Sequence, residues 1–333
     1  MTATETLVDV QGLTVDFLAG RKELRAVEDI AFTLRTGEVL ALLGESGSGK
    51  TATLRALMRL LPERRARTRG HVIVDGVDVL ALPRRKLSDY RGRTVAMVFQ
   101  EPGLALDPVY RLGDQIAEVV KRHEGVSWRT GRERALDLFR RVHIPAPERR
   151  LDNYPHELSG GMRQRAMIAL ALACRPKLLL ADEPTTALDA TVQIQILLLL
   201  RELQREFGLA VIFVTHDIGV AIEVADRIAV MYAGRIVETG DCRSVVRAPA
   251  HPYTKGLLAT RPQRALAIRE RLPAITGNQP DLASRPGGCT FAPRCKDARA
   301  ACEVRIPPET SVSVGHSVRC MLVQPSRTED EIR

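Results

Sequence analysis

Short apolar runs alternate with stretches of mixed polarity over the first 240 residues. Four runs have the length and composition of buried parallel strands, and they occupy residues 39–43, 94–99, 178–182 and 210–214. Residues 51–61 and 162–173 instead carry apolar side chains at helical spacing. Strands that alternate with helices predict one large α/β domain. Beyond Gly240, prolines interrupt a basic helical stretch at 254–271, which predicts a smaller appendage.

The segment between the first apolar run and the first helix is a phosphate-loop motif. It reads GESGSGKT and matches G-x-x-x-x-G-K-[ST]. Its glycines let backbone N–H groups approach phosphate oxygens, where a side chain would obstruct them. We expect Lys50 to bridge the β- and γ-phosphates and the Thr51 hydroxyl to bind Mg²⁺. The predicted ATP-binding residues are Gly44, Glu45, Ser46, Gly47, Ser48, Gly49, Lys50 and Thr51.

Polar residues follow the other apolar runs. Asp182 ends one run and can hold the water shell of the metal, while Glu183 follows at once and can act as general base on the attacking water. His216 follows the run 210–214 and can stabilise charge on the γ-phosphate. Gln100 follows the run 94–99 and offers an amide to the metal or to water. An isolated His or Gln would more often be structural, so these two interpretations depend on the neighbouring motifs.

A second anion site opens the helix at 162–173. Ser159 is a good N-cap residue, and Gly160 and Gly161 leave backbone N–H groups open at the positive end of the helix dipole. The chain already has a phosphate loop, so this second site is expected to serve the γ-phosphate held by another domain. The sequence contains no second phosphate loop and no internal repeat. The other domain must therefore come from another chain.

Taken together, these motifs resemble the ATP-binding cassette (ABC) family over residues 7–238. The resemblance implies a P-loop NTPase fold at 1–240, with a RecA-like core, an antiparallel β subdomain and a helical subdomain at about 101–173. It also implies that two cassettes sandwich two ATP molecules, with the signature of each acting on the nucleotide of the other. Phe17 would contact adenine, Thr51, Gln100 and Asp182 would bind Mg²⁺, and Asp189 in the turn 187–189 would lie at the dimer seam.

Three further segments resemble the oligopeptide/dipeptide permease group of that family. They are DEPTTALDATVQIQIL, the GMRQR after the signature glycines, and HPYT at 251–254. LSGGM at 158–162 favours a D-type subunit, which implies a heterodimer with an F-type ATPase, two membrane subunits and an extracytoplasmic solute-binding protein. The implied location is the cytoplasmic face of the inner membrane. Residues 99–108 depart from the usual segment of the group near the docking surface for the membrane subunits.

Charge and hydropathy narrow the function classes. The formal net charge is +9, and four arginines cluster at 64–69. Aromatic residues make up only 4%, which argues against base stacking and specific nucleic-acid binding. No run of eighteen apolar residues occurs, and the first residues lack a signal-peptide pattern. We therefore expect a soluble protein that contacts the membrane through partners. Its basic charge fits proximity to an anionic membrane surface, and most of its arginines are expected to be solvated surface residues.

The appendage at 241–333 gathers four of the six cysteines within residues 289–320. Disulfides are not expected in a cytoplasmic ATPase. Four thiolates suit zinc or an iron–sulfur cluster, and small buried cysteines without metal are the third alternative. The loose spacing, and a resemblance to the tails of some permease ATPases, favour a [4Fe–4S] cluster on Cys289, Cys295, Cys302 and Cys320. Cys174 and Cys242 are interpreted as structural.

These observations predict the ATP-hydrolysing subunit of an ABC importer for di- or oligopeptides. Nickel or glutathione are alternative cargoes, because systems for those solutes resemble the peptide group. A non-transport ABC ATPase that acts on nucleic acid or ribosomes is the alternative from another class. Such proteins usually carry two cassettes in one chain or a long coiled-coil insertion, and neither is present. A phosphate-loop module without turnover is disfavoured, because Glu183 and His216 are both present.

Overall fold

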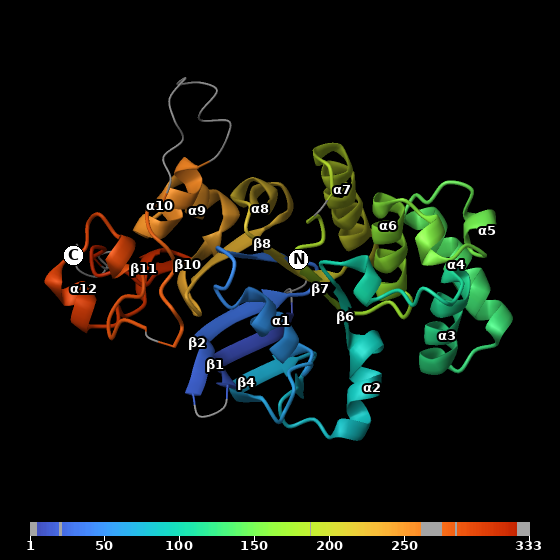
Figure 1. The fold of residues 1–333 in the computed structure, drawn as a ribbon, viewed down its shortest axis with the longest axis horizontal. Coiled ribbons are helices and arrows are strands. Elements are labelled where there is room, and N and C mark those ends of the chain that lie inside the picture. Colours follow the sequence, from blue (N-terminus) through green and yellow to red (C-terminus); the bar gives the residue numbers. More distant parts are fainter. Residues whose placement is uncertain (1–4, 20–21, 187, 261–274, 284, 325–333) are drawn as a thin grey trace. The chain divides into compact units, whose positions relative to one another are not determined.

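The computed structural model describes residues 5–19, 22–186, 188–260, 275–283 and 285–324 (Figure 1). The chain forms two compact units and passes between them several times. The first unit comprises Met1–Asp9, Thr33–Val39 and Val72–Val214. The second comprises Val10–Phe32, Leu40–His71 and Thr215–Arg333.

Three parallel strands form the sheet of the first unit, in the order β8-β7-β6. They are β6 (Val95–Val98), β7 (Leu178–Asp182) and β8 (Ala210–Thr215), whose last residue opens the second unit. Every residue of β6, β7 and β8 is buried. This burial explains why these strands appear in the sequence as unbroken apolar runs rather than as alternating patterns.

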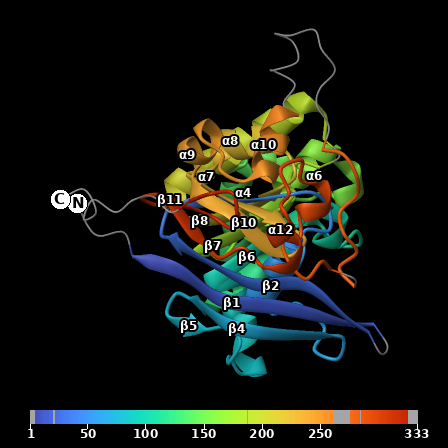
Figure 2. The ribbon, with the colours of Figure 1, turned by 90° about the vertical axis from the view of Figure 1, so that its left-hand side faces the viewer.

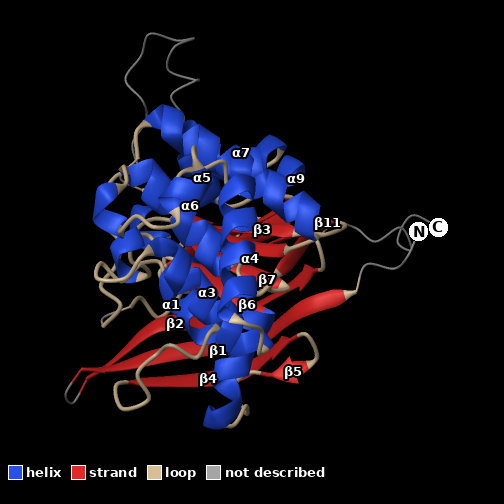
Figure 3. Cartoon of the chain, turned by 90° about the vertical axis from the view of Figure 1, so that its right-hand side faces the viewer, coloured by secondary structure: helices blue, strands red, loops and turns tan. Residues whose placement is uncertain are grey.

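Helices make up much of the rest of the first unit (Figure 3). The short α2 (Leu87–Asp89) is followed by α3 (Leu112–Glu124), α4 (Trp128–Arg141) and the short α5 (Pro147–Arg150). Then come α6 (Gly160–Ala171) and α7 (Ala190–Phe207). Helices α3 and α4 approach closely at Gly131, where an added Cβ would lie 2.8 Å from the carbonyl oxygen of Ala117. Glycine at this position therefore permits the contact.

The second unit contains a mixed sheet in the order β11-β12-β10-β9-β3. Strand β3 (Val39–Leu43) is parallel to β9 (Arg227–Tyr232), which is antiparallel to β10 (Arg235–Asp241). The C-terminal extension adds β12 (His316–Val318) to β10 and then β11 (Thr310–Ser313). The extension is thus part of the sheet. The helices of the second unit include α1 (Lys50–Leu57) and α8 (Ile218–Val224) in the cassette. Those of the extension include α9 (Cys242–Arg247), α10 (Pro252–Ala259) and α12 (Ala300–Val304).

A separate antiparallel sheet has the order β2-β1-β4-β5 (Figure 2). It consists of β1 (Thr6–Ala19), β2 (Lys22–Arg35), β4 (Ala66–Val74) and the short β5 (Val77–Asp78). The predicted basic helix at 254–271 is described only as far as Thr260, and its remainder lies outside the described residues. No helix among the described residues is long and apolar enough to cross a membrane.

The core of the second unit joins the cassette strands to the extension. Tyr232 at the end of β9, Tyr253 of α10 and Phe291 of the extension pack with ring centroids 4.7 to 5.4 Å apart. Tyr232 and Tyr253 are fully buried. Cys289 and Cys295 pack against the same cluster. Aromatic packing of this kind fixes the extension against the strand that flanks β3.

Candidate nucleotide site and its supports

The phosphate loop connects β3 to α1, and glycine is required at two of its positions. Gly49 is the N-cap of α1 with φ 103°, in the region that L side chains rarely adopt. A Cβ there would lie 2.5 Å from the carbonyl oxygen of Ala26. At Gly44 a Cβ would lie 2.2 Å from the carbonyl oxygen of Met231. Close backbone packing behind the loop therefore leaves no room for side chains.

Lys50 begins α1, and its ammonium lies over the loop. Nζ donates to the carbonyl oxygens of Gly44 at 2.7 Å and Glu45 at 2.9 Å. The residue is only 5% exposed, so its charge is held among main-chain dipoles rather than in water. Thr51 follows it in the first turn of α1 and is half-buried. A cation beside a glycine-rich loop at a helix N-terminus forms a site for an anion.

In the first unit, the two adjacent carboxylates lie at the end of β7. Asp182 is 5% exposed, and Glu183 is half-buried with φ 45°. The N–H of Glu183 donates to Val214 of β8 at 3.1 Å, and its carboxylate accepts from the Thr186 hydroxyl at 3.0 Å. A left-handed non-glycine residue stores strain, and such residues gather at functional sites.

The signature opens α6 and is open to solvent. Ser159 is the N-cap and accepts from the Met162 N–H at 3.4 Å, as predicted from its residue type. Ser159 and Gly160 are exposed, and Gly161 is half-buried. Asp189 is also exposed, and the structure gives it a capping role in α7, where it accepts from the Val192 N–H at 2.9 Å.

The remaining predicted site residues lie at element ends or on a strand. Gln100 is exposed just beyond β6, and Phe17 is half-buried on β1. His216 is exposed in the turn between β8 and α8. The next residue, Asp217, caps α8 by accepting from the Gly219 N–H at 2.7 Å. His216 is thus held in a turn that is fixed on both sides.

The HPYT segment contacts the phosphate loop, which the sequence did not reveal. Tyr253 Oη accepts a hydrogen bond from the backbone N–H of Glu45 at 2.9 Å. His251 caps α10, because its Nδ1 accepts from the Tyr253 N–H at 3.0 Å. The N–H of His251 in turn donates to the buried carboxylate of Glu238 at 2.9 Å. Burial lowers the pKa of His251 to about 3, and the charge of Lys255 acts in the same direction.

The four cysteines of the extension line one small cavity of about 10 Å³, together with His251 and Phe291. All four are free, and burial raises the pKa of the Cys289, Cys295 and Cys320 thiols. No group of three or more His, Cys, Asp or Glu side chains is arranged to hold a metal in the described part of the chain. The donor set is therefore gathered in one place, but its arrangement does not support the predicted [4Fe–4S] cluster.

Comparison with known proteins gives two family matches. The model of the ABC transporter family matches residues 27–186, and that of the oligopeptide/dipeptide transporter C-terminal region matches 237–302. A peptide import ATP-binding protein of Brucella melitensis is 48% identical over 95% of this chain and 97% of its own length. A peptide ABC transporter ATP-binding protein of Sinorhizobium fredii is 46% identical, with 95% of each chain covered.

The fold is also similar to that of solved cassettes. The dimeric ATP-binding cassette MJ0796, in a post-hydrolysis state with ADP and phosphate, is 30% identical with a TM-score of 0.63. The match covers 71% of this chain and 99% of that one. A second dimeric structure of the same cassette matches equally well.

Proposed function

Because the chain belongs to the ABC transporter family, we propose that it is the ATP-hydrolysing subunit of an importer for peptides. The observation that carries this proposal is the joint presence of a complete phosphate loop and a C-terminal region of the oligopeptide/dipeptide transporter type. We place the cassette at 1–240, with a helical subdomain at about 101–173, and the extension at 241–333. Relatives named for peptide import cover nearly the whole chain, which supports peptides as the cargo.

In the proposed mechanism, ATP would bind at the phosphate loop, and Mg²⁺ when bound would supply Lewis acidity. Lys50 would bind the β- and γ-phosphates, while Thr51, Gln100 and Asp182 would hold the metal or its waters. Glu183 takes the proton of the attacking water, and its strained backbone supports this role. His216 stabilises charge on the γ-phosphate. Phe17 packs against the adenine ring.

The partner of this cassette is a homologous F-type ATPase subunit in our proposal. The signature supports a composite site, because Ser159 and Gly160 are exposed at a helix N-terminus and so can meet a nucleotide held elsewhere. Asp189, also exposed, would lie at the seam between the two cassettes. Two membrane subunits and a solute-binding protein complete the importer. The chain is then peripheral to the cytoplasmic face of the inner membrane.

A [4Fe–4S] cluster on Cys289, Cys295, Cys302 and Cys320 stays a separate proposal. The gathering of four thiols around one cavity supports it, and the absence of a metal-holding group among the described residues speaks against it. Iron content and the visible absorption of anaerobically purified full-length protein test it. About four irons per chain would support the cluster, whereas colourless protein with one zinc, or with no metal, would contradict it.

Glutamine at position 183 tests the ATPase assignment. Glu183→Gln removes the general base and keeps the shape of the side chain, so we expect ATP to bind and hydrolysis to fall by 10²-fold or more. ATP should then hold the variant in a closed pair with its partner cassette on gel filtration. Lys50→Ala is the matched control, because it should abolish ATP binding and the association. ATP turnover at the wild-type rate by E183Q, with the partner's site disabled, would contradict the proposal.

A further inference from the structure

The C-terminal extension contacts the phosphate loop through a bidentate ion pair. Arg294 donates to both oxygens of Glu45, from Nη1 to Oε2 at 2.9 Å and from Nη2 to Oε1 at 3.2 Å. Glu45 is the second residue of the phosphate loop, and Arg294 immediately precedes Cys295. Two segments 249 residues apart in sequence therefore meet at the edge of the nucleotide site.

Contacts other than the one to Glu45 also hold the Arg294 side chain in place. Its Nε donates to the carbonyl oxygen of Thr276 at 3.0 Å, and its Nη2 to that of Ile275 at 3.3 Å. The guanidinium also lies over the ring of Tyr232, with Cζ 5.7 Å from the ring centroid. Its side chain is 6% exposed. A planar, buried and prepositioned fork loses little entropy when it pairs with a carboxylate.

Glu45 is a negative charge inside a motif that must accept an anion. Its backbone forms part of the loop, since its carbonyl oxygen accepts from Lys50 and its N–H donates to Tyr253. Its carboxylate also accepts from the Gln279 amide at 3.1 Å. Without a cation beside it, this carboxylate would repel the phosphates of ATP across a short distance. Arg294 is the cation that pairs with it.

We propose that Arg294 is a positioning residue for nucleotide binding, because it neutralises Glu45 and fixes the Glu45 side chain. Through Arg294, the cysteine-bearing extension raises the affinity of the phosphate loop for ATP. The inference rests on the proposed binding of ATP at residues 44–51. It assigns a role to the extension within the nucleotide site of the same chain. The extension is thereby more than a docking appendage.

The test is a double-mutant cycle on the full-length chain, with the dissociation constant for MgATP as the readout. Arg294→Gln should raise this constant about tenfold, or about 1.4 kcal/mol, because it leaves Glu45 unpaired. Glu45→Gln removes the carboxylate that Arg294 pairs with, so its dissociation constant is the reference for the double variant. The double variant should return to within about twofold of Glu45→Gln. A merely structural role of Arg294 would not give this rescue.

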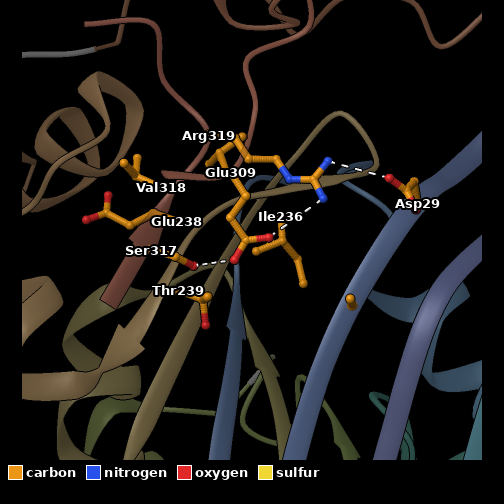
Figure 4. A pocket seen from close by; sticks show the side chains of 10 residues that line it. Asp29, Ile236, Glu238, Thr239, Glu309, Ser317, Val318 and Arg319 are labelled. Atoms are coloured by element: carbon orange, nitrogen blue, oxygen red, sulfur yellow. Dashed lines mark hydrogen bonds and ion pairs between the residues drawn. The ribbon is translucent and has the colours of Figure 1, made fainter. Parts of the chain in front are cut away.

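Arg319→Gln is the matched control. Arg319 belongs to the same extension and pairs with Asp29 and Glu309 at 3.7 and 3.9 Å, at the cavity beside β10 and β12 (Figure 4). Loss of this arginine should leave the dissociation constant unchanged.

Three results would overturn the inference. Arg294→Gln could bind ATP as tightly as the wild type, or the double variant could stay as weak as Arg294→Gln. Should Arg294→Gln fail to fold, Arg294→Lys still decides, because it keeps a positive charge beside Glu45; a tenfold weakening of MgATP binding in that folded variant would contradict neutralisation. A wild-type chain that does not bind ATP would instead contradict the proposed function itself.

Discussion

Replacement of His251 by asparagine tests whether this one buried imidazole makes the stability of the folded chain depend on pH. His251 is 1% exposed, and its Nδ1 accepts the hydrogen bond that caps α10. Nδ1 must therefore stay unprotonated in the folded protein. Asparagine is among the best N-cap residues and does not titrate. His251→Asn should thus keep the cap and remove the titration.

The size of the effect follows from the lowered pKa. The imidazole has an ordinary pKa of 6.5, and burial lowers it to about 3 in the folded chain. Below pH 6.5 the unfolded chain takes up a proton that the folded chain refuses, so stability is lost as the pH falls towards 3. At about 1.4 kcal/mol per pKa unit, acidification to pH 5 costs about 2 kcal/mol.

Urea unfolding followed by circular dichroism at several pH values between 7.5 and 5 measures this cost. All other titrating groups are common to the two proteins, so the difference between wild type and His251→Asn reports on His251 alone. The wild type should lose about 2 kcal/mol more than the variant over this range. Parallel losses in the two proteins would show that His251 titrates normally and would refute the reasoning.

Three further perturbations test the supports of the site. Gly49→Ala should abolish ATP binding in a titration, because its Cβ would meet the Ala26 carbonyl oxygen at 2.5 Å. The control Gly125→Ala has nothing within 4 Å of its Cβ, so it should cost only about 1 kcal/mol of stability and leave ATP binding intact. Equal ATP binding by the two variants would contradict the close packing at Gly49. Burial alone would raise the pKa of Glu28, but its bonds and charge contacts with Arg235 and Arg285 outweigh burial and lower it below 4.5. The Glu28 carboxylate therefore contributes stability above pH 4.5, which is lost as the pH falls through the lowered pKa. Between pH 6 and pH 3 the wild type should lose more free energy of unfolding than Glu28→Gln. Equal losses in the two proteins would count against the ion pairs of Glu28. In metal-free protein, the raised pKa of Cys289, Cys295 and Cys320 should make iodoacetamide labelling at pH 8 slower than that of the urea-unfolded chain, and equal rates, read by mass spectrometry, would show that the thiols are not buried.

Much of the fold could be predicted because its signals are local. Apolar runs predicted strands at 39–43, 94–99, 178–182 and 210–214, and the structure has strands within one residue of these bounds. The phosphate loop was predictable because only glycine tolerates its backbone and its close contacts. The α/β cassette fold that the motifs implied is confirmed by its likeness to solved cassettes. The catalytic and metal-binding roles of the individual residues stay predictions.

The contacts of the extension could not be predicted, because they join segments far apart in sequence. Strand β11 reads TSVS, which carries little hydrophobic signal, and β12 spans only three residues. Strand β12 forms by pairing with β10, and β11 by pairing with β12, rather than from their own propensity. The pairing of Arg294 with Glu45 has no sequence signature at all. Cysteine spacing likewise predicted a cluster whose geometry the described residues do not show.

Uptake of a labelled peptide tests the central claim most directly. The assay uses proteoliposomes that contain this chain, its proposed F-type partner and the two membrane subunits, with the solute-binding protein outside and ATP inside. We expect ATP-dependent accumulation of the peptide, and its loss when Glu183→Gln replaces the wild-type chain. Accumulation that continues with Glu183→Gln, or ATP hydrolysis that peptide-loaded binding protein does not stimulate, would contradict the account.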